Sequence, residues 1–250
     1  MFAYKVHPKY PLLLIGNRDE FYNRPTKHAT FWDDHPQILA GRDLEKNGTW
    51  LGITKEGRFA ALTNFRDPNK VLINSRSRGE LVSSFLKSST LPEKYLDDIK
   101  KSHHLYQGFN LLVGNVHELH YYSKLDNKAF KLAPGIYGLS NHSLDTPWPK
   151  VTLGKKLISE AITYDSQIHS KLFDILKNDE RPPDINLPNT DVGLKWERLL
   201  SSIYIKSHEY GTRAMTVLSY SKDNKVTFIE KSLLQERDKW IESFYHFYLK

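Results

Sequence analysis

The sequence predicts a layered α+β protein that folds as one domain. Of its 250 residues 39% are hydrophobic, and these include 12 Phe, 14 Tyr and 5 Trp, which is enough apolar mass for a core. Strand-like runs fill the first and last thirds of the chain, and two helix-like blocks interrupt them. No repeat, low-complexity tract or linker marks a boundary, so we expect a single domain over residues 1–250.

The first third is expected to consist of strands and turns. Residues 55–57 end in a glycine, which is typical of a short hairpin loop between two strands. The expected strands are residues 2–6, 10–16, 38–41, 49–54 and 58–64.

Helical periodicity then appears in two blocks. Apolar side chains at positions 81, 82, 85 and 86 predict a helix over residues 78–87, and Pro92 is typical of the first turn of a second helix over 91–101. The later block predicts helices over 147–164 and 169–177, followed by a proline-rich loop. The remaining expected strands are residues 108–114, 118–123, 136–141, 202–206, 212–219, 225–231 and 240–249.

Charge and composition exclude several classes of protein. The net charge is +7, but the basic residues are scattered, and the densest groups (Arg76/Arg78, Lys100/Lys101 and Lys155/Lys156) do not extend into a stripe. We therefore expect no nucleic-acid partner. The sequence has no apolar run of about 18 residues and no secretory signal, so we expect a cytoplasmic protein without stable membrane insertion. The absence of cysteine excludes disulfides and thiolate chemistry within the chain as written.

Four places in the chain carry side chains suited to catalysis. Residues 17–20 (Asn-Arg-Asp-Glu) follow an apolar run and predict either a charged network at a site or a turn with a surface ion pair. Asn64 and Asn141 each end a predicted strand, where an amide can donate to an oxyanion or simply cap a turn. Arg213 either binds a carbonyl or carboxylate group or is an ordinary arginine of a strand edge.

The sequence gives no sign of a metal or cofactor site. Its eleven histidines lack the spacing of metal ligands, and neither a nucleophile elbow, a phosphate-binding loop nor a dinucleotide fingerprint is present. We expect no metal and no cofactor.

Taken together, these residues resemble the NRDE family, whose eukaryotic members are called transport and Golgi organisation 2. The resemblance extends over essentially the whole chain. It rests on residues 17–22, Arg24-Pro25, Phe31-Trp32, residues 48–53, 60–64, 78–82, 108–111 and 137–141, Thr146-Pro147-Trp148 and residues 210–213.

The family pattern is similar to the N-terminal nucleophile hydrolases of the bile-salt hydrolase and penicillin V acylase branch. That resemblance implies a four-layer αββα sandwich of two stacked, mainly antiparallel sheets, and an amidohydrolase acting on a small non-peptide acyl amide. It implies that Asn64 and Asn141 are oxyanion donors and that Arg213 lies beside the nucleophile. For the charged pair near the nucleophile it implies Arg18 with Asp19, and Glu20 is the close alternative. Asn17 and Trp50 are assigned to substrate binding.

The beginning of the chain departs from the family pattern. Members begin Met-Cys, followed by apolar residues and an aromatic, and the cysteine is the nucleophile once Met is removed. This sequence begins Met1-Phe2-Ala3-Tyr4. Two explanations are open: an upstream segment carries Met-Cys, or the protein is a true short form, which we expect to be catalytically inactive.

A non-enzymatic role is the alternative function. The aromatic residues Phe31, Trp32, Trp50 and Trp148 are either the walls of a pocket for haem or an acyl lipid, or ordinary core residues. The partner is accordingly a small amide substrate in the first case and a haem or lipid ligand in the second. The sequence carries no signal for the identity of the substrate or for the oligomeric state.

Overall fold

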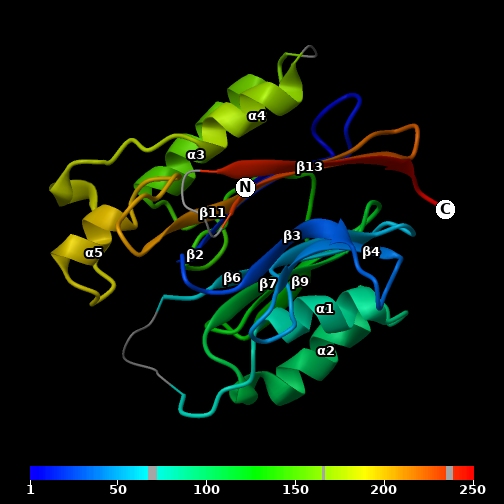
Figure 1. Cartoon of the computed structure of the whole chain (residues 1–250), viewed down its shortest axis with the longest axis horizontal. Helices are drawn as coiled ribbons and strands as arrows, with labels where there is room; N and C mark the ends of the chain where they lie inside the picture. Colours follow the sequence, from blue (N-terminus) through cyan, green and yellow to red (C-terminus); the bar gives the residue numbers. More distant parts are fainter. Residues whose placement is uncertain (67–71, 165–166, 235–238) are drawn as a thin grey trace. The chain divides into compact units, whose positions relative to one another are not determined.

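The computed structural model describes residues 1–66, 72–164, 167–234 and 239–250 (Figure 1). These residues divide into two compact units, each of which is made of three separate segments of the chain. The first unit comprises residues 1–24, 134–139 and 145–247, and the second comprises residues 25–133, 140–144 and 248–250. The expectation of a single domain stays a prediction.

The first unit contains a six-stranded sheet in the order β10-β1-β2-β11-β12-β13. The strands are β1 (Phe2–Tyr4), β2 (Leu12–Phe21), β10 (Gly135–Tyr137), β11 (Tyr210–Tyr220), β12 (Lys225–Leu233) and β13 (Trp240–Tyr248). Helices α3 (Pro149–Ala161) and α4 (Ile168–Leu176) pack on one face of this sheet, where Leu13 and Ile15 of β2 share a buried cluster with Ile158 and Leu172. A short helix, α5 (Leu194–Leu199), and a 3-10 turn, η2 (Asp184–Asn186), complete the unit.

The second unit contains a seven-stranded sheet in the order β3-β4-β5-β6-β7-β8-β9. The strands are β3 (Thr26–Phe31), β4 (Ile38–Asp43), β5 (Leu51–Thr54), β6 (Arg58–Asn64), β7 (Phe109–Asn115), β8 (Leu119–Ser123) and β9 (Lys128–Lys131). Helices α1 (Gly79–Lys87) and α2 (Pro92–Ser102) cover one face, and a 3-10 turn, η1 (His103–Leu105), follows α2. Phe85 of α1 and Phe109 of β7 are fully buried in the cluster between helices and sheet.

Every strand pair whose register is described is antiparallel. The predicted α+β class with two antiparallel sheets is therefore confirmed, and each unit carries its helices on one face of its sheet. The predicted hairpin glycine is confirmed as well. Gly57 has φ +81°, a left-handed conformation that costs an ordinary residue energy, and its N–H donates to Thr54 O at 2.9 Å.

Three predictions about elements were wrong. Residues 17–20 do not follow β2 but lie inside it, because β11 pairs with β2 as far as Phe21. Residues 202–206 form no strand. Ile203 and Ile205 are buried, as a strand would require, but Ile203 O accepts a hydrogen bond from the Asn17 side chain instead of from a neighbouring strand. The strand expected over 136–141 ends at Tyr137, so Asn141 lies in the following loop.

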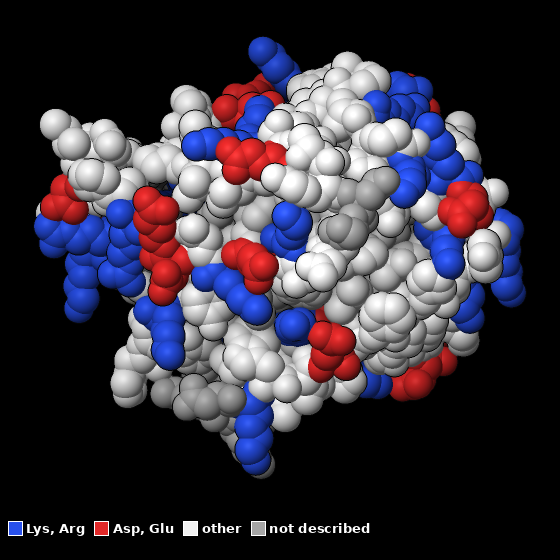
Figure 2. Space-filling view, turned by 90° about the horizontal axis from the view of Figure 1, so that it is seen from above, with Lys and Arg blue, Asp and Glu red and all other residues white. Residues whose placement is uncertain are grey.

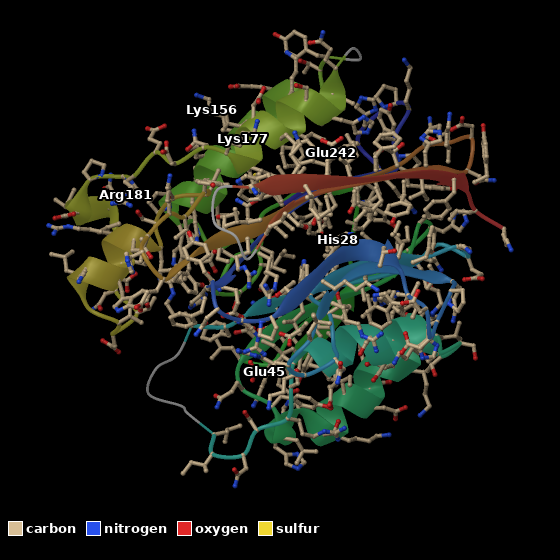
Figure 3. The ribbon with its side chains drawn as sticks, in the orientation of Figure 1. His28, Glu45, Lys156, Lys177, Arg181 and Glu242 are labelled. Atoms are coloured by element: carbon tan, nitrogen blue, oxygen red, sulfur yellow. The ribbon has the colours of Figure 1, made fainter. Side chains whose placement is uncertain are left out.

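Charged side chains are distributed over the surface. Basic and acidic residues alternate over much of the face in Figure 2. Lys156 on α3, Lys177 directly after α4 and Arg181 in the next loop are all exposed (Figure 3), and Asp179 and Glu180 interrupt the basic residues along the chain. On the face shown, the charge is therefore scattered, as the sequence indicates.

Candidate functional site

Strand β2 separates the four residues Asn17 to Glu20 onto two faces of the sheet. Successive side chains of a strand point to opposite faces. Asn17 faces the helices, since its Nδ2 donates to Leu176 O, at the end of α4, and to Ile203 O, both at 2.8 Å. Asp19 is on this face too, and Arg18 and Glu20 are on the other. The two acids that the sequence left as alternatives therefore have different surroundings.

Asp19 is partly buried beside β11 and helix α3. Its Oδ1 accepts a hydrogen bond from Thr212 Oγ1 at 2.6 Å. The positive charges of Lys150, on α3, and of Arg18 also act on this carboxyl. Burial raises the pKa of the Asp19 carboxyl, and the hydrogen bond from Thr212 together with these two cations opposes the rise without cancelling it. Asp19 therefore retains its proton to a higher pH than an exposed aspartate does.

Glu20 lies between two arginines. Its Oε2 is 3.7 Å from Arg18 Nη2 and 3.7 Å from Arg24 Nε, and its Oε1 accepts the N–H of Phe21 at 2.9 Å. Arg18 is 9% exposed, so its guanidinium is largely removed from water. A buried arginine close to a carboxylate is held in place by charge-assisted contacts.

Arg213 joins this group at an irregularity of β11. The register of β11 on β2 shifts between Thr212 and Ala214, so Arg213 occupies a β-bulge. It is 4% exposed, and its Nη1 donates to Phe21 O at 3.3 Å and to Arg24 O. Burial lowers the pKa of Arg213, and the nearby Glu20 opposes the shift. The first unit thus places Arg18, Arg24 and Arg213 around Glu20.

In the second unit, Asn64 and Asn141 are hydrogen-bonded to each other. The Asn141 Nδ2 donates to Asn64 O at 2.9 Å, and the N–H of Arg66 donates to Asn141 O at 2.8 Å. Phe65 and His142 stack at a tilt, with ring centroids 4.9 Å apart. Asn141 therefore fixes the chain at the end of β6, while the side chain of Asn64 is exposed.

A residue that the sequence analysis missed, Asn110, supports this pair. It is fully buried in β7, where its Nδ2 donates to Thr63 Oγ1 (3.1 Å) and to His142 O (2.9 Å), and its Oδ1 accepts from Tyr121 OH (2.6 Å). Both residues it contacts with Nδ2 directly neighbour Asn64 or Asn141 in sequence. An asparagine inside the apolar run of residues 109–113 was the available signal, because a buried amide needs partners.

The aromatic residues of the alternative function are mostly part of the packing. Trp32 is 2% exposed, and its Nε1 donates to Ala40 O at 3.1 Å. Trp148 is also buried. Trp50 is partly buried against Gly41, where an added Cβ would lie 2.3 Å from the indole ring. Gly41 is thus required for the position of Trp50, which packs on β4.

The structure brings the predicted residues together in two sets, one in each unit. The first unit holds Asn17, Arg18, Asp19, Glu20 and Arg213, and the second holds Trp50, Asn64 and Asn141. Among the described residues no group of three or more His, Asp or Glu side chains is arranged to bind a metal ion. In the same part of the chain, no helix has the length and apolar character needed to cross a membrane.

The distribution of these residues along the whole chain agrees with one protein family. The family model described as "Transport and Golgi organisation 2" matches residues 1–235. This chain belongs to that family. It is 37% identical to the Transport and Golgi organization protein 2 homolog of Bos taurus, over 96% of this chain and 94% of that protein. It is 36% identical to the human homolog, with the same coverage, and 31% identical to an uncharacterised protein of Saccharomyces cerevisiae, over 93% of this chain and 91% of that protein.

Among solved structures, the chain is similar to a variant of conjugated bile acid hydrolase from Clostridium perfringens. The TM-score is 0.48 and the sequence identity 8%, over 95% of this chain and 94% of the other.

The family resemblance that the sequence predicts is confirmed by the family model and by the relatives.

Proposed function

We propose that this member of the Transport and Golgi organisation 2 family is an amidohydrolase-like protein of the N-terminal nucleophile class, acting on a small non-peptide acyl amide. In such a reaction the thiol of an N-terminal cysteine attacks the carbonyl carbon of the amide, and its own α-amine takes the thiol proton and passes it to the departing amine. Water then hydrolyses the thioester.

One observation carries the proposal: β1 pairs with β2 so that the residues preceding β1 lie beside the part of β2 that contains Arg18. Phe2 lies opposite Leu14, and Met1 exchanges two hydrogen bonds with Ile15, at 2.8 and 2.9 Å. Met1 packs on the helical face, since a Cβ on Gly154 of α3 would meet its sulfur. A residue added directly before Met1 would therefore lie opposite Gly16, with its side chain on the opposite face.

That opposite face is the one that carries Arg18 and Glu20. A cysteine at the added position would be a diagonal neighbour of Arg18 across the strand pair. Arg18 and Arg24 each lie 3.7 Å from Glu20, and Arg213 is within its electrostatic reach. An arginine beside a thiol lowers the pKa of the thiol and favours the nucleophilic thiolate. In this proposal Glu20, rather than Asp19, is the acid that accompanies Arg18, and Asp19 supports the sheet from its helical face.

For the second unit, we propose Asn64 as the oxyanion donor. Its exposed side-chain amide has two N–H groups, and its backbone is fixed through Asn141. Asn141 uses its own amide to hold Asn64, so a positioning role adds to the donor role that the resemblance implies for it.

The test is acylation of a chain extended by Met-Cys directly before Met1. After removal of the initiator methionine, the protein is incubated with an activated acyl ester, and its intact mass is measured. We expect one acyl group on the terminal cysteine and a weaker reaction in an Arg18→Gln variant of the extended chain. A Met-Ala extension is the matched control and should gain no mass.

Absence of an adduct with every acyl ester tried, while the cysteine still reacts with a small alkylating reagent, would refute the proposal. If the chain instead bound haem or an acyl lipid equally well with the Met-Cys and the Met-Ala extension, the non-enzymatic binding role would be favoured.

A further inference from the structure

The side chains on the helical face of β2 have no part in the acyl transfer proposed above. Asn17 and Asp19 both hold the buried segment that precedes β11. Asn17 Nδ2 donates to Ile203 O at 2.8 Å. Asp19 reaches the same segment through Thr212, whose Oγ1 donates to Asp19 Oδ1 at 2.6 Å and accepts the N–H of Ile205 at 2.9 Å. These contacts tie β2, β11 and the preceding segment together on one face of the sheet.

The backbone of Thr212 is held as firmly as its hydroxyl group. Its N–H donates to Ile205 O at 2.8 Å. The residue before it permits this close approach because it has no side chain: a Cβ on Gly211 would lie 2.5 Å from Ile205 O. Thr212 is 1% exposed, so its polar groups depend on partners within the protein. Thr212 is therefore a fixed point at the start of β11.

The β-bulge of β11 begins directly after this fixed point. Thr212 lies opposite Asp19, and Ala214 lies opposite Arg18. Arg213 is therefore the extra residue of the bulge. In a regular ladder Arg213 would lie directly opposite Arg18, and like charges in that arrangement destabilise a strand pair. The bulge instead allows the guanidinium of Arg213 to donate to two backbone carbonyl oxygens near the end of β2.

We propose that Thr212 is a positioning residue, which together with Asp19 fixes the β-bulge that directs Arg213 to the group around Glu20. The charge of Glu20 acts on Arg213, since it opposes the lowering of the Arg213 pKa by burial. Loss of the Thr212 hydroxyl removes the link between Asp19 and the segment before β11, and the bulge then loses its fixed point. The effect on the reaction rests on the acyl transfer proposed above, whereas the placement of Arg213 does not.

The first experiment measures the placement of Arg213 in the native chain. Phenylglyoxal modifies accessible guanidinium groups, and peptide mass mapping over time identifies the modified residues. Arg213, which is 4% exposed, should react slowly, and the exposed Arg181 should react fast. Thr212→Val removes the hydroxyl but keeps the shape, so modification of Arg213 should become about tenfold faster, the factor that corresponds to one lost hydrogen bond. Thr212→Ser keeps the hydroxyl and should retain the slow reaction.

Thr227→Val is the matched control for this experiment. Thr227 is a buried threonine of the neighbouring strand β12, and its Oγ1 lies 3.1 Å from His246 Nδ1. This variant should leave the modification of Arg213 unchanged. Thermal unfolding verifies that each variant is folded. If Thr212→Val does not fold, Asp19→Ala takes its place, because it removes the same hydrogen bond together with a carboxyl whose burial is costly. Equal rates at Arg213 in this variant and in Thr227→Val would overturn the proposal.

The second experiment measures the effect on the reaction, in the chain extended by Met-Cys before Met1. The rate of acylation by an activated acyl ester is followed over a series of pH values. Because an arginine beside a thiol lowers the pKa of the thiol, the midpoint of the rate against pH should lie about one pH unit higher in Thr212→Val than in the extended chain without it. Thr212→Ser should restore the midpoint, and Thr227→Val should not move it.

A loss of stability alone would not move this midpoint, so the pH profile separates a positioning role from a merely structural one. An unchanged midpoint in Thr212→Val would overturn the positioning role. If none of the extended chains were acylated, the acyl transfer would be refuted, and the phenylglyoxal reaction of the native chain would still decide whether Thr212 fixes the position of Arg213.

Discussion

Replacement of Asn110 by alanine should be among the most destabilising substitutions of a polar residue in the second unit. The side chain is fully buried and takes part in three hydrogen bonds, with Thr63, His142 and Tyr121. Each hydrogen bond contributes about 1–1.5 kcal/mol net to stability, and alanine would leave the partner groups without these hydrogen bonds. We therefore expect the free energy of unfolding to fall by about 3–4 kcal/mol, which corresponds to a decrease of about 10 °C in melting temperature for a chain of this length.

The assay is urea unfolding followed by tryptophan fluorescence, and Asn64→Ala is the matched control. The side chain of Asn64 is exposed, and the neighbouring residues contact its backbone rather than its amide. Asn64→Ala should therefore change the free energy of unfolding by less than about 0.5 kcal/mol. If Asn110→Ala cost less than about 1 kcal/mol, or no more than Asn64→Ala, the network around Asn110 would not support this part of the sheet.

Two further predictions concern stability. Because burial raises the pKa of Asp19, the folded protein holds this proton more strongly than the unfolded chain, and stability is lost as the pH rises from 3.8 through the folded pKa. Thermal unfolding at a series of pH values should show a smaller loss for Asp19→Asn than for the native protein. An equal loss in both would contradict the burial of the carboxyl. Gly57→Ala should lower the melting temperature more than Gly193→Ala does. Both glycines have a positive φ (+81° and +83°), but a Cβ at Gly57 would lie 2.7 Å from Leu249, and a Cβ at Gly193 would meet nothing within 4 Å. Equal melting temperatures of the two variants would contradict that contact.

Much of the fold can be predicted from the sequence because most elements have a strong apolar pattern. Helix α1 and strand β6 lie within one residue of their expected bounds, since α1 presents a regular buried face and β6 contains a continuous apolar run from Phe59 to Leu62. Strands β3 and β9 were missed because they form the two edges of their sheet and are mostly polar, with the sequences TKHATF and KAFK. An edge strand needs little apolar surface and therefore leaves little signal.

The candidate residues could be predicted by type, but their grouping could not. Four polar residues after an apolar run indicate a strand end, so Arg18 and Asp19 were expected to act together. The pairing of β2 with β11 as far as Phe21 makes the segment a strand, and neighbouring residues then face opposite ways. The role of Asn110 likewise depends on Thr63 and Tyr121, which are distant in sequence and meet it only through the order of the sheet.

The most direct test of this account is the position of the nucleophile relative to β2. Two extended chains are compared, one with cysteine directly before Met1 and one with cysteine one residue earlier and alanine between. The alternation of the strand places the first cysteine on the face of Arg18 and Glu20 and the second on the helical face. Intact mass after incubation with an acyl ester should show an adduct on the first chain and little or none on the second. Equal acylation of both chains, or acylation of the second alone, would contradict the assignment of the Arg18 face as the reactive one.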